Sequence, residues 1–290
     1  MFKSTNFTNM EQISLAKEIA VIGVEETPFT SMLMAKGNIE KALSTIYTWR
    51  EKTLNTLGDL SAVEGSDDIT FFESARAELS NVLEIFKVGV QISGTAEAMK
   101  STQLNEEVQD RLLELKVNME KKFILGIKND GSKAPFKRQM AGLLEQADTS
   151  NAVAVTGAIA EADIKKAMRN LWDKNTGAGT VYAFVNADLK EQIDSIYVDK
   201  YGYNHVTTDF GLIVDSINTN YGRVHFVLSP HIPADKVVFF KDTYVDLAYL
   251  REPKVEALAK SGDNSKLQIV AEATLKVASP KAVGIMTVTA

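Results

Sequence analysis

Few residues in this 290-residue chain stand at spacings that support catalysis or metal binding. The chain has no cysteine, which excludes thiolate nucleophiles, disulfides and zinc sites built on cysteine. Its three histidines, His205, His225 and His231, form no HExxH segment, and no nucleophile motif accompanies them. We therefore expect no catalytic residue, no metal site and no cofactor.

Two other patterns could carry chemistry but have simpler explanations. The segment TGAGT at 176–180 lacks both the Gly-Lys-Ser/Thr of a phosphate-binding loop and the spacing of a dinucleotide-binding loop, so we interpret it as a helix stop. Paired carboxylates at Asp67-Asp68 and Glu106-Glu107 could serve acid–base chemistry. One pair lies in a polar stretch and the other in the first turn of a predicted helix, where solvated charge accounts for both.

Positive charge gathers between residues 120 and 139. Its members are Lys121, Lys122, Lys128, Lys133, Lys137 and Arg138, against Glu120 and Asp130. Such a segment can contact nucleic acid or an acidic neighbouring surface. The only aromatic residues within it are Phe123 and Phe136, which argues against sequence-specific base recognition. The net charge of −6 also argues against a chain whose main task is to bind phosphates.

Composition indicates a globular protein with a large core. Hydrophobic residues make up 45% of the chain, and no low-complexity tract interrupts it. The apolar part of the N-terminal segment contains Lys17 and Glu18, and no later segment offers about 18 uncharged apolar residues. We expect neither a signal peptide nor a membrane span.

Two strands and a polar stretch between them predict a long hairpin. Alternation places Leu43, Thr45, Tyr47 and Trp49 on one face of a strand at 42–49, and Phe86, Val88, Val90 and Ile92 on one face of a strand at 86–93. An isolated hairpin is marginally stable in water, so it needs support from elsewhere. Its aromatic residues could pack in a core, but a hairpin has little core of its own, which favours contact with a partner.

A long helix follows at 104–126. Its apolar stripe consists of Leu104, Val108, Leu112, Leu115, Met119 and Phe123. Acidic residues in the first turn, lysines in the last turn and Gly126 after it are typical of a well-delimited helix. Residues 127–139 then predict a loop.

The second half predicts an α+β arrangement. A helix carries Ile164, Ala167, Met168, Leu171 and Trp172 on one face and ends near Gly177. Further predicted elements are a strand at 181–185, a helix at 187–197, strands at 212–217, 223–228 and 237–240, and extended segments at 244–250 and 266–277 around the turn at 261–265.

The order of several short segments resembles the major capsid proteins of tailed bacteriophages, which have the Johnson fold. These segments are TPFTSML at 27–33, Trp49 with Leu54, Glu64 with Gly65, QISGTAEA at 91–98, LNEEV at 104–108, RQMAGLLE at 138–145, TDFGLIV at 208–214, Leu250 with Arg251, LAKSGDNSK at 258–266 and EATL at 272–275. Within that group the chain is most similar to compact major head proteins that begin with a Thr-Pro-Phe arm.

The resemblance implies a domain organisation. The parts are an N-terminal arm at 1–40, an extension loop with flanking strands at 41–100, a peripheral domain with the spine helix at 101–150, an axial domain at 151–235, and strands returning to the peripheral domain at 236–290. The arm and the extension loop would reach over adjacent subunits.

The resemblance also implies residues that contact other copies. In the extension loop these are Tyr47, Trp49, Arg50, Glu64, Phe71, Phe72 and Phe86, and in a loop between capsomers they are Lys128, Lys133, Lys137 and Arg138. Some relatives crosslink a loop lysine to an asparagine of a neighbour. Lys52 lies in the corresponding element, but no matching asparagine or assisting acid is found, so this chemistry is not carried over.

The implied function is structural. Copies would assemble as pentamers and hexamers into an icosahedral shell that encloses double-stranded DNA without sequence-specific binding. The shell would be assembled in the cytoplasm of a bacterial host and become part of the virion, and no reaction would be catalysed. Scaffold, portal and decoration proteins are the further partners, and no membrane is involved.

Three alternatives remain at this stage. Encapsulin-type bacterial compartments share the fold and differ in cargo. A small soluble α+β enzyme would need a convergent polar pocket, for which the sequence shows no residue set. A DNA-binding module is opposed by the acidic net charge.

Overall fold

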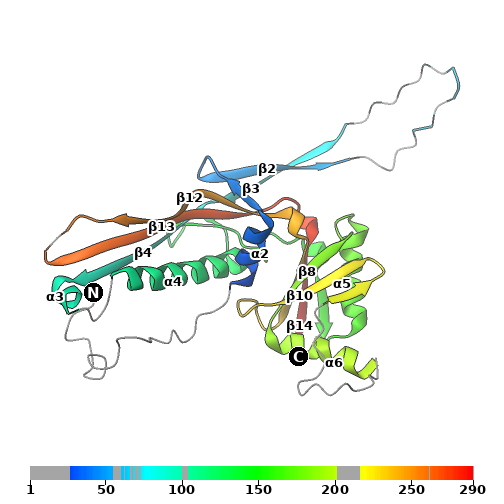
Figure 1. The fold of residues 1–290 in the computed structure, drawn as a ribbon. Helices are drawn as coiled ribbons and strands as arrows, with labels where there is room; N and C mark the ends of the chain where they lie inside the picture. The colour runs from blue at the N-terminus through cyan, green and yellow to red at the C-terminus, as the bar shows by residue number, and fades with distance from the viewer. Residues whose placement is uncertain are drawn as a thin grey trace.

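The computed structural model describes residues 27–54, 73–99, 104–200, 216–260 and 262–289, together with Leu60, Ser61, Val63, Glu64, Gly65, Asp67, Ile69 and Phe71. The chain is α+β and elongated (Figure 1). A four-stranded sheet backed by the long helix α4 forms one end, a six-stranded sheet with helices α5 and α6 forms the other, and a two-stranded hairpin projects from between them. We call the two ends the four-stranded region and the six-stranded region.

The four-stranded region joins segments that are distant in sequence. Its strand order is β1 (Ile39–Lys41), β12 (Val245–Ala257), β13 (Asn264–Val277) and β4 (Glu84–Ser93). The β1–β12 pair is parallel and the other pairs are antiparallel. The predicted alternation in β4 is confirmed, since Phe86, Val90 and Ile92 are buried.

Helix α4 (Leu104–Leu125) packs across β4 and β13, and the short helix α3 (Gly94–Ala98) precedes it. The predicted stripe is confirmed in its C-terminal half, where Leu115, Met119 and Phe123 are buried. Leu112 departs from the prediction with 42% of its surface exposed, because it lines an open groove beside helix α2 (Pro28–Lys36) and β12. In the described ranges, no helix is both long enough and apolar enough to cross a membrane.

The six-stranded region builds its sheet from strands of both halves of the chain. The order is β7 (Val153–Thr156), β14 (Val283–Thr289), β11 (Lys236–Phe240), β8 (Thr180–Val185), β10 (Gly222–Leu228) and β9 (Ser216–Thr219). The β8–β10 and β7–β14 pairs are parallel, and the other pairs are antiparallel.

Helices α5 (Glu161–Asp173) and α6 (Ala187–Lys200) share one hydrophobic cluster with this sheet. As predicted, Ile164, Ala167, Met168 and Leu171 are buried, whereas Trp172 is half exposed. Other residues of the sheet, including Phe184 and Phe240, belong to the cluster that fills the four-stranded region. The two regions therefore share a continuous core.

Helix α2 (Pro28–Lys36) lies where the regions meet. Pro28 suits its first turn, and Gly37, with a φ of +75°, ends it in a left-handed conformation that favours glycine. The ring of Phe29 contacts those of Phe184 and Phe240 edge-on, with centroids 5.7 and 5.5 Å apart. A helix near the start of the described chain thus packs against strands from its second half.

Several predictions need correction. The strand expected at 42–49 begins later, as β2 (Ile46–Thr53), and Leu43 precedes it with 86% of its surface exposed. Residues 236–290 do not return as a whole to the four-stranded region, because β11 and β14 pair inside the six-stranded sheet. Alternation reveals a strand but not its neighbour, which explains this error.

The connections add short elements. The predicted loop at 127–139 contains a small ladder of β5 (Asn129–Asp130) and β6 (Arg138–Gln139). The described ranges contain three 3-10 turns, at Thr149–Asn151, Asp242–Tyr244 and Pro280–Ala282. Of the predicted strand at 212–217, residues 212–215 lie outside the described residues, and β9 begins at Ser216.

Candidate functional site: the projecting hairpin and the basic loop

The predicted hairpin exists, but its second strand is β3 (Ala75–Val82) and not β4. β2 and β3 pair antiparallel from Ile46 opposite Val82 to Thr53 opposite Ala75. β3 escaped prediction because its sequence, ARAELSNV, is exposed along most of its length and shows no apolar alternation. β4 pairs instead with β13.

Phe86 therefore does not belong to the hairpin. It lies in β4 with 8% of its surface exposed and packs in the core of the four-stranded region. The hypothesis that Phe86 contacts another subunit is corrected, since the core-packing alternative describes its surroundings.

The base of the hairpin is attached to the chain through one face of β2. Tyr47 and Trp49 are half-buried neighbours on this face, with ring centroids 6.1 Å apart. The Tyr47 hydroxyl donates to Glu40, and Lys276 donates to the same carboxylate at 2.7 Å. Burial, and then the hydrogen bond to Glu40, raise the pKa of Tyr47 to about 12. Tyr47 is thus held in its neutral, hydrogen-bonding form.

A second polar contact lies further along the same face. Glu51 accepts a hydrogen bond from the Ser279 hydroxyl at 2.8 Å and forms an ion pair with Lys281 at 3.2 Å. These partners lie in the connection between β13 and β14. Two contacts on one face fix the direction in which the hairpin leaves the molecule. Arg50 is exposed on the other face, opposite Glu78.

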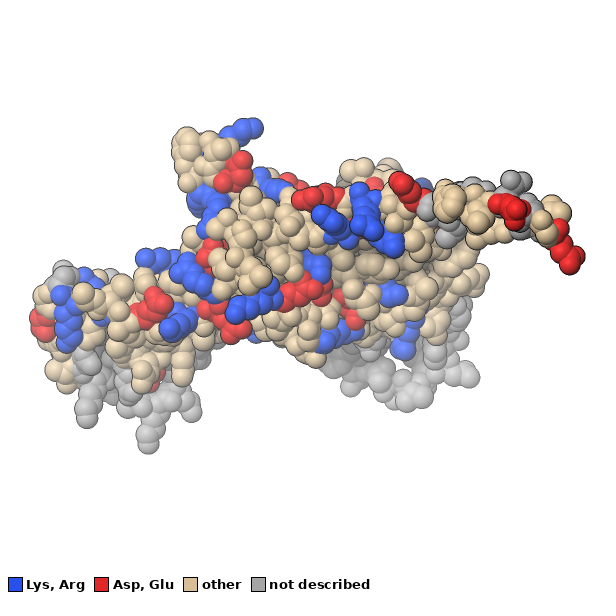
Figure 2. Space-filling view, turned by 90° about the horizontal axis from the view of Figure 1, so that it is seen from above, with Lys and Arg blue, Asp and Glu red and all other residues tan. Residues whose placement is uncertain are grey.

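The outer part of the hairpin exposes apolar side chains within a largely polar stretch of sequence. Its exposed apolar residues are Leu54, Leu60, Val63, Ile69 and Phe71. Phe71 has 86% of its surface exposed, and Glu64 beside the turn is exposed too. Phe72, the remaining predicted contact, lies outside the described residues. Viewed from above, acidic side chains stand at the projecting end (Figure 2).

The structure divides the basic loop into two pairs of residues. Lys128 donates through its Nζ to the Ser80 carbonyl at 2.7 Å, and Arg138 donates to Glu272 at 2.7 Å. Lys133 and Lys137 are exposed on the outer part of the loop. Two of the four predicted contact residues therefore have partners within the chain, and two project from it. Across this face, blue and red side chains are interspersed and form no single-sign field (Figure 2).

Glu272 explains why Arg138 faces inward. Its side chain is almost fully buried in β13 and accepts from both Arg138 and Arg251, the latter at 3.1 Å. A buried carboxylate needs charged or hydrogen-bonding partners, and the two arginines supply them. Arg138 is thus a structural residue of the four-stranded region.

Glu120, in sequence only a charge opposing the basic segment, has a structural role in the fold. It is fully buried in α4 and accepts from the backbone amides of Phe29 and Thr30, each at 2.8 Å, and from the Thr30 hydroxyl. Glu120 therefore supplies hydrogen-bond acceptors for the first turn of α2, whose amides have no partner within the helix.

The described residues offer no catalytic constellation. They contain no group of three His, Cys, Asp or Glu residues that could hold a metal ion. His231 is buried, and the ring of His225 contacts Tyr182 edge-on at 5.7 Å. His205 lies outside the described residues. What the geometry offers is a pair of projecting surfaces.

Comparison with known proteins identifies the family of the chain. The sequence matches the SU10 major capsid protein family over residues 3–290. The chain belongs to this family. The major capsid protein of Escherichia phage Phieco32 is 24% identical over 335 residues, which cover 96% of this chain and 94% of that protein. This member of the SU10 family is therefore a phage major capsid protein and a component of the virion.

Solved structures show the fold of this SU10-family member. The capsid structure of cyanophage P-SCSP1u covers 99% of this chain and 97% of its own, with a TM-score of 0.69 and 11% identity. Gordonia phage Cozz follows with a TM-score of 0.65, 10% identity, and 98% and 91% coverage. The SrpI encapsulin of Synechococcus elongatus has a TM-score of 0.61, 11% identity, and 97% and 95% coverage. At such identities these likenesses show the fold alone, which is the predicted Johnson fold.

Proposed function

We propose that copies of this chain associate as pentamers and hexamers and close into an icosahedral shell that encloses double-stranded DNA. The observation that carries the proposal is the projecting hairpin. Its outer part exposes Leu60, Ile69 and Phe71 and has no core of its own, whereas its base is held in one direction by Tyr47 and Glu51. An adjacent copy would supply the missing apolar surface.

Different residues of the two projecting surfaces would have different tasks. Arg50, Glu64, Phe71 and Phe72 would contact a neighbouring copy, and Tyr47 and Trp49 would mainly fix the base of the hairpin. Lys133 and Lys137 would meet acidic residues of another capsomer, where opposite charges favour correct orientation. Lys128 and Arg138 would keep their partners within the chain.

The chain would catalyse no reaction and need no cofactor. A mildly acidic subunit suits a shell whose inner surface must not hold DNA tightly, so packaged DNA would be enclosed without sequence-specific contacts. Assembly would take place in the host cytoplasm with scaffold, portal and decoration proteins as further partners. The peripheral domain would correspond to the four-stranded region and the axial domain to the six-stranded region.

The test combines light scattering with electron microscopy of the purified chain and of a Phe71→Asp variant. We expect closed shells, or rings of five and six copies, from the wild type. Phe71→Asp should lower the yield of shells at least tenfold and leave the unfolding transition unchanged, because it places a charge on a surface that must become dry. Leu43→Asp is the matched control, since Leu43 is equally exposed but lies outside the hairpin.

Shells formed by Phe71→Asp at the wild-type yield would overturn the role of the hairpin. A wild-type chain that stays monomeric when scaffold or phage lysate is added would overturn the proposal as a whole. Nuclease treatment identifies the cargo, and protein in place of DNA would indicate an encapsulin-like compartment.

A further inference from the structure

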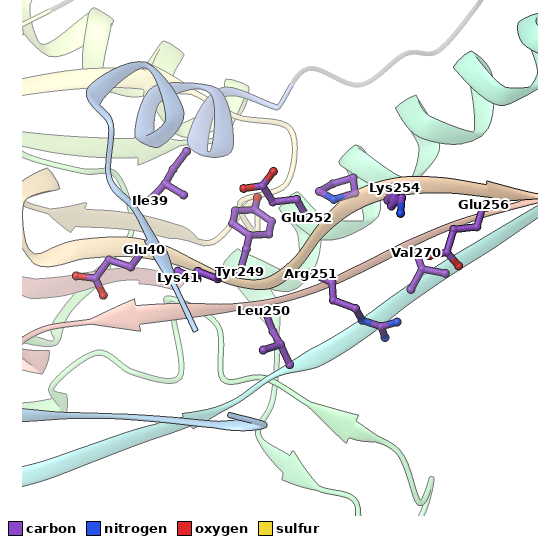
Figure 3. Close-up of a pocket in the computed structure, with 11 residues that line it drawn as sticks. Ile39, Glu40, Lys41, Tyr249, Leu250, Arg251, Glu252, Lys254, Glu256 and Val270 are labelled. Carbon is purple, nitrogen blue, oxygen red and sulfur yellow. The ribbon is translucent and has the colours of Figure 1, made fainter. Parts of the chain in front are cut away.

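An apolar groove lies between helices α2 and α4 and strand β12. Its volume is about 660 Å³, and its apolar lining includes Met34, Ile39, Leu112, Leu113, Tyr249 and Pro253. Met34, Ile39 and Leu112 are each exposed by more than two fifths of their surface. Ile39 and Tyr249 lie between α2 and α4, whereas Leu250 and Arg251 point to the other side of the strand (Figure 3). Open apolar surfaces of this kind are typical of binding sites.

We propose that residues 10–24 of the same chain occupy this groove. The first argument is where the described chain begins. Thr27 directly precedes α2, and Thr30, one turn later, lines the groove. Glu120 binds the amides of Phe29 and Thr30, which fixes this end of α2 against α4. The described chain therefore begins beside the groove, and this short tether would give the preceding residues a high effective concentration there.

The composition and length of the segment fit the groove. Residues 10–24, MEQISLAKEIAVIGV, are mostly apolar, with Glu11, Lys17 and Glu18 as their charged members. The α4 residues in the lining extend from Gln109 to Met119, about 15 Å at 1.5 Å per residue. A segment of 15 residues covers this distance in either a helical or an extended conformation.

A polar group in the lining supports the same occupant. Tyr249 lines the groove, and its buried hydroxyl has no hydrogen-bond partner among the described residues. Burial, with Glu252 nearby, raises the pKa of Tyr249 to about 12, so this hydroxyl stays protonated as a donor. Buried tyrosine hydroxyls usually find a partner, and a backbone carbonyl of a segment in the groove would accept this hydrogen bond.

The test follows tryptic cleavage after Lys17 by mass spectrometry in dilute, unassembled full-length subunits. A synthetic peptide of residues 10–24 gives the unprotected rate, and we expect cleavage in the full chain to be at least tenfold slower. Leu112→Gln should accelerate it at least fivefold. Leu125→Gln should not, because Leu125 lies on the same helix with a similar exposed fraction, 43% against 42%, and does not line the groove.

A second measurement uses the absence of cysteine in the chain. Cysteine is introduced at Gln109 and, one at a time, at Ser14, Ala16 and Ala20, and a short bis-maleimide should join at least one pair within a monomer. The proposal is overturned by a cleavage rate equal to that of the peptide, by equal effects of the two leucine variants, or by crosslinks that form only between copies. Since the subunits are unassembled, the result is independent of whether shells form.

Discussion

The six-stranded region and the projecting hairpin use the same kind of residue in opposite ways. Phe239 of β11 has 1% of its surface exposed and packs with residues of α5, α6 and the neighbouring strands. Phe71 of the hairpin has 86% of its surface exposed. Phe239 completes a core within the chain, whereas Phe71 has no such core around it, and we propose that it contacts a neighbouring copy. On this proposal, the two residues separate stability of the fold from association of the copies.

The largest difference in the free energy of unfolding should be found between two single variants, in each of which one of these phenylalanines is replaced by alanine. Phe239→Ala should lower the free energy of unfolding by about 3–5 kcal/mol, because it leaves a cavity in a closed core. Phe71→Ala should change it by less than about 0.5 kcal/mol, since solvent already surrounds the ring. Denaturant unfolding of both variants measures the difference. Similar losses in both would mean that the hairpin packs on its own chain in solution.

A loss of stability between these two values is expected at Glu120, which joins the start of α2 to α4. Glu120→Ala should cost about 2–4 kcal/mol, because it leaves the buried amides of Phe29 and Thr30 without acceptors. Glu120→Gln retains one acceptor oxygen and should cost less. Unfolding curves of the two variants give the ranking, and an alanine variant as stable as the wild type would show that α2 is held by its apolar contacts alone.

Two residues of the basic loop allow the same comparison between stability of the fold and association of the copies. Arg138→Ala should cost about 1–3 kcal/mol, because the buried Glu272 loses one of its two arginine partners. Lys133→Ala should leave the unfolding transition unchanged and reduce the rate of shell assembly, measured by light scattering at low salt. The division of the loop would be contradicted by a Lys133 variant that unfolds as easily as the Arg138 variant.

The smallest effect on stability is expected at Asp148, which lies just before β7, a strand of the six-stranded sheet. The Ser150 backbone amide at 2.9 Å and the Lys174 ammonium at 3.0 Å lower the pKa of Asp148 to about 2. This carboxylate should stabilise the fold above about pH 4, and the contribution should disappear as the pH falls towards 2. Because the group is partly open to solvent, we expect about 1 kcal/mol or less.

Unfolding of the wild type and of Asp148→Asn at pH 5, 3.5 and 2.5 measures this contribution. The difference between the two should be largest at pH 5 and should shrink at each lower pH. If this difference in the free energy of unfolding did not change with pH, the loss of stability in Asp148→Asn would come from the altered hydrogen-bonding group and not from the lost charge.

The sequence predicted most accurately those elements whose buried face follows from the spacing of apolar residues along the element itself. The helix at 104–125 and the alternation in β4 follow from spacing alone, because one face of each packs on the other element. The resemblance added the fold, which the comparisons show. Strand pairing was harder to predict. The hairpin partner of β2 lacks alternation, and the places of β11 and β14 depend on contacts that no local pattern encodes.

The candidate site shows the same limit. Exposure of the hairpin residues near the turn followed from their polar surroundings, whereas the inward direction of Arg138 could not, since it depends on a carboxylate at position 272, far along the chain. Phe86 looked like an exposed aromatic residue of a hairpin only while its strand was assigned to that hairpin. Glu120 has its partners 90 and 91 positions away, beyond the reach of any periodicity.

The position of β14 in the six-stranded sheet has a consequence for protein synthesis. β14 lies between β7 and β11, and in the described sheet β7 has no other neighbour. A ribosome makes residues 153–156 long before residues 283–289, so the nascent chain carries β7 as an unpaired edge until residues 283–289 have been translated. A subunit that must associate with many copies of itself thus completes this sheet only after a strand that lies more than a hundred residues further along the chain has been made.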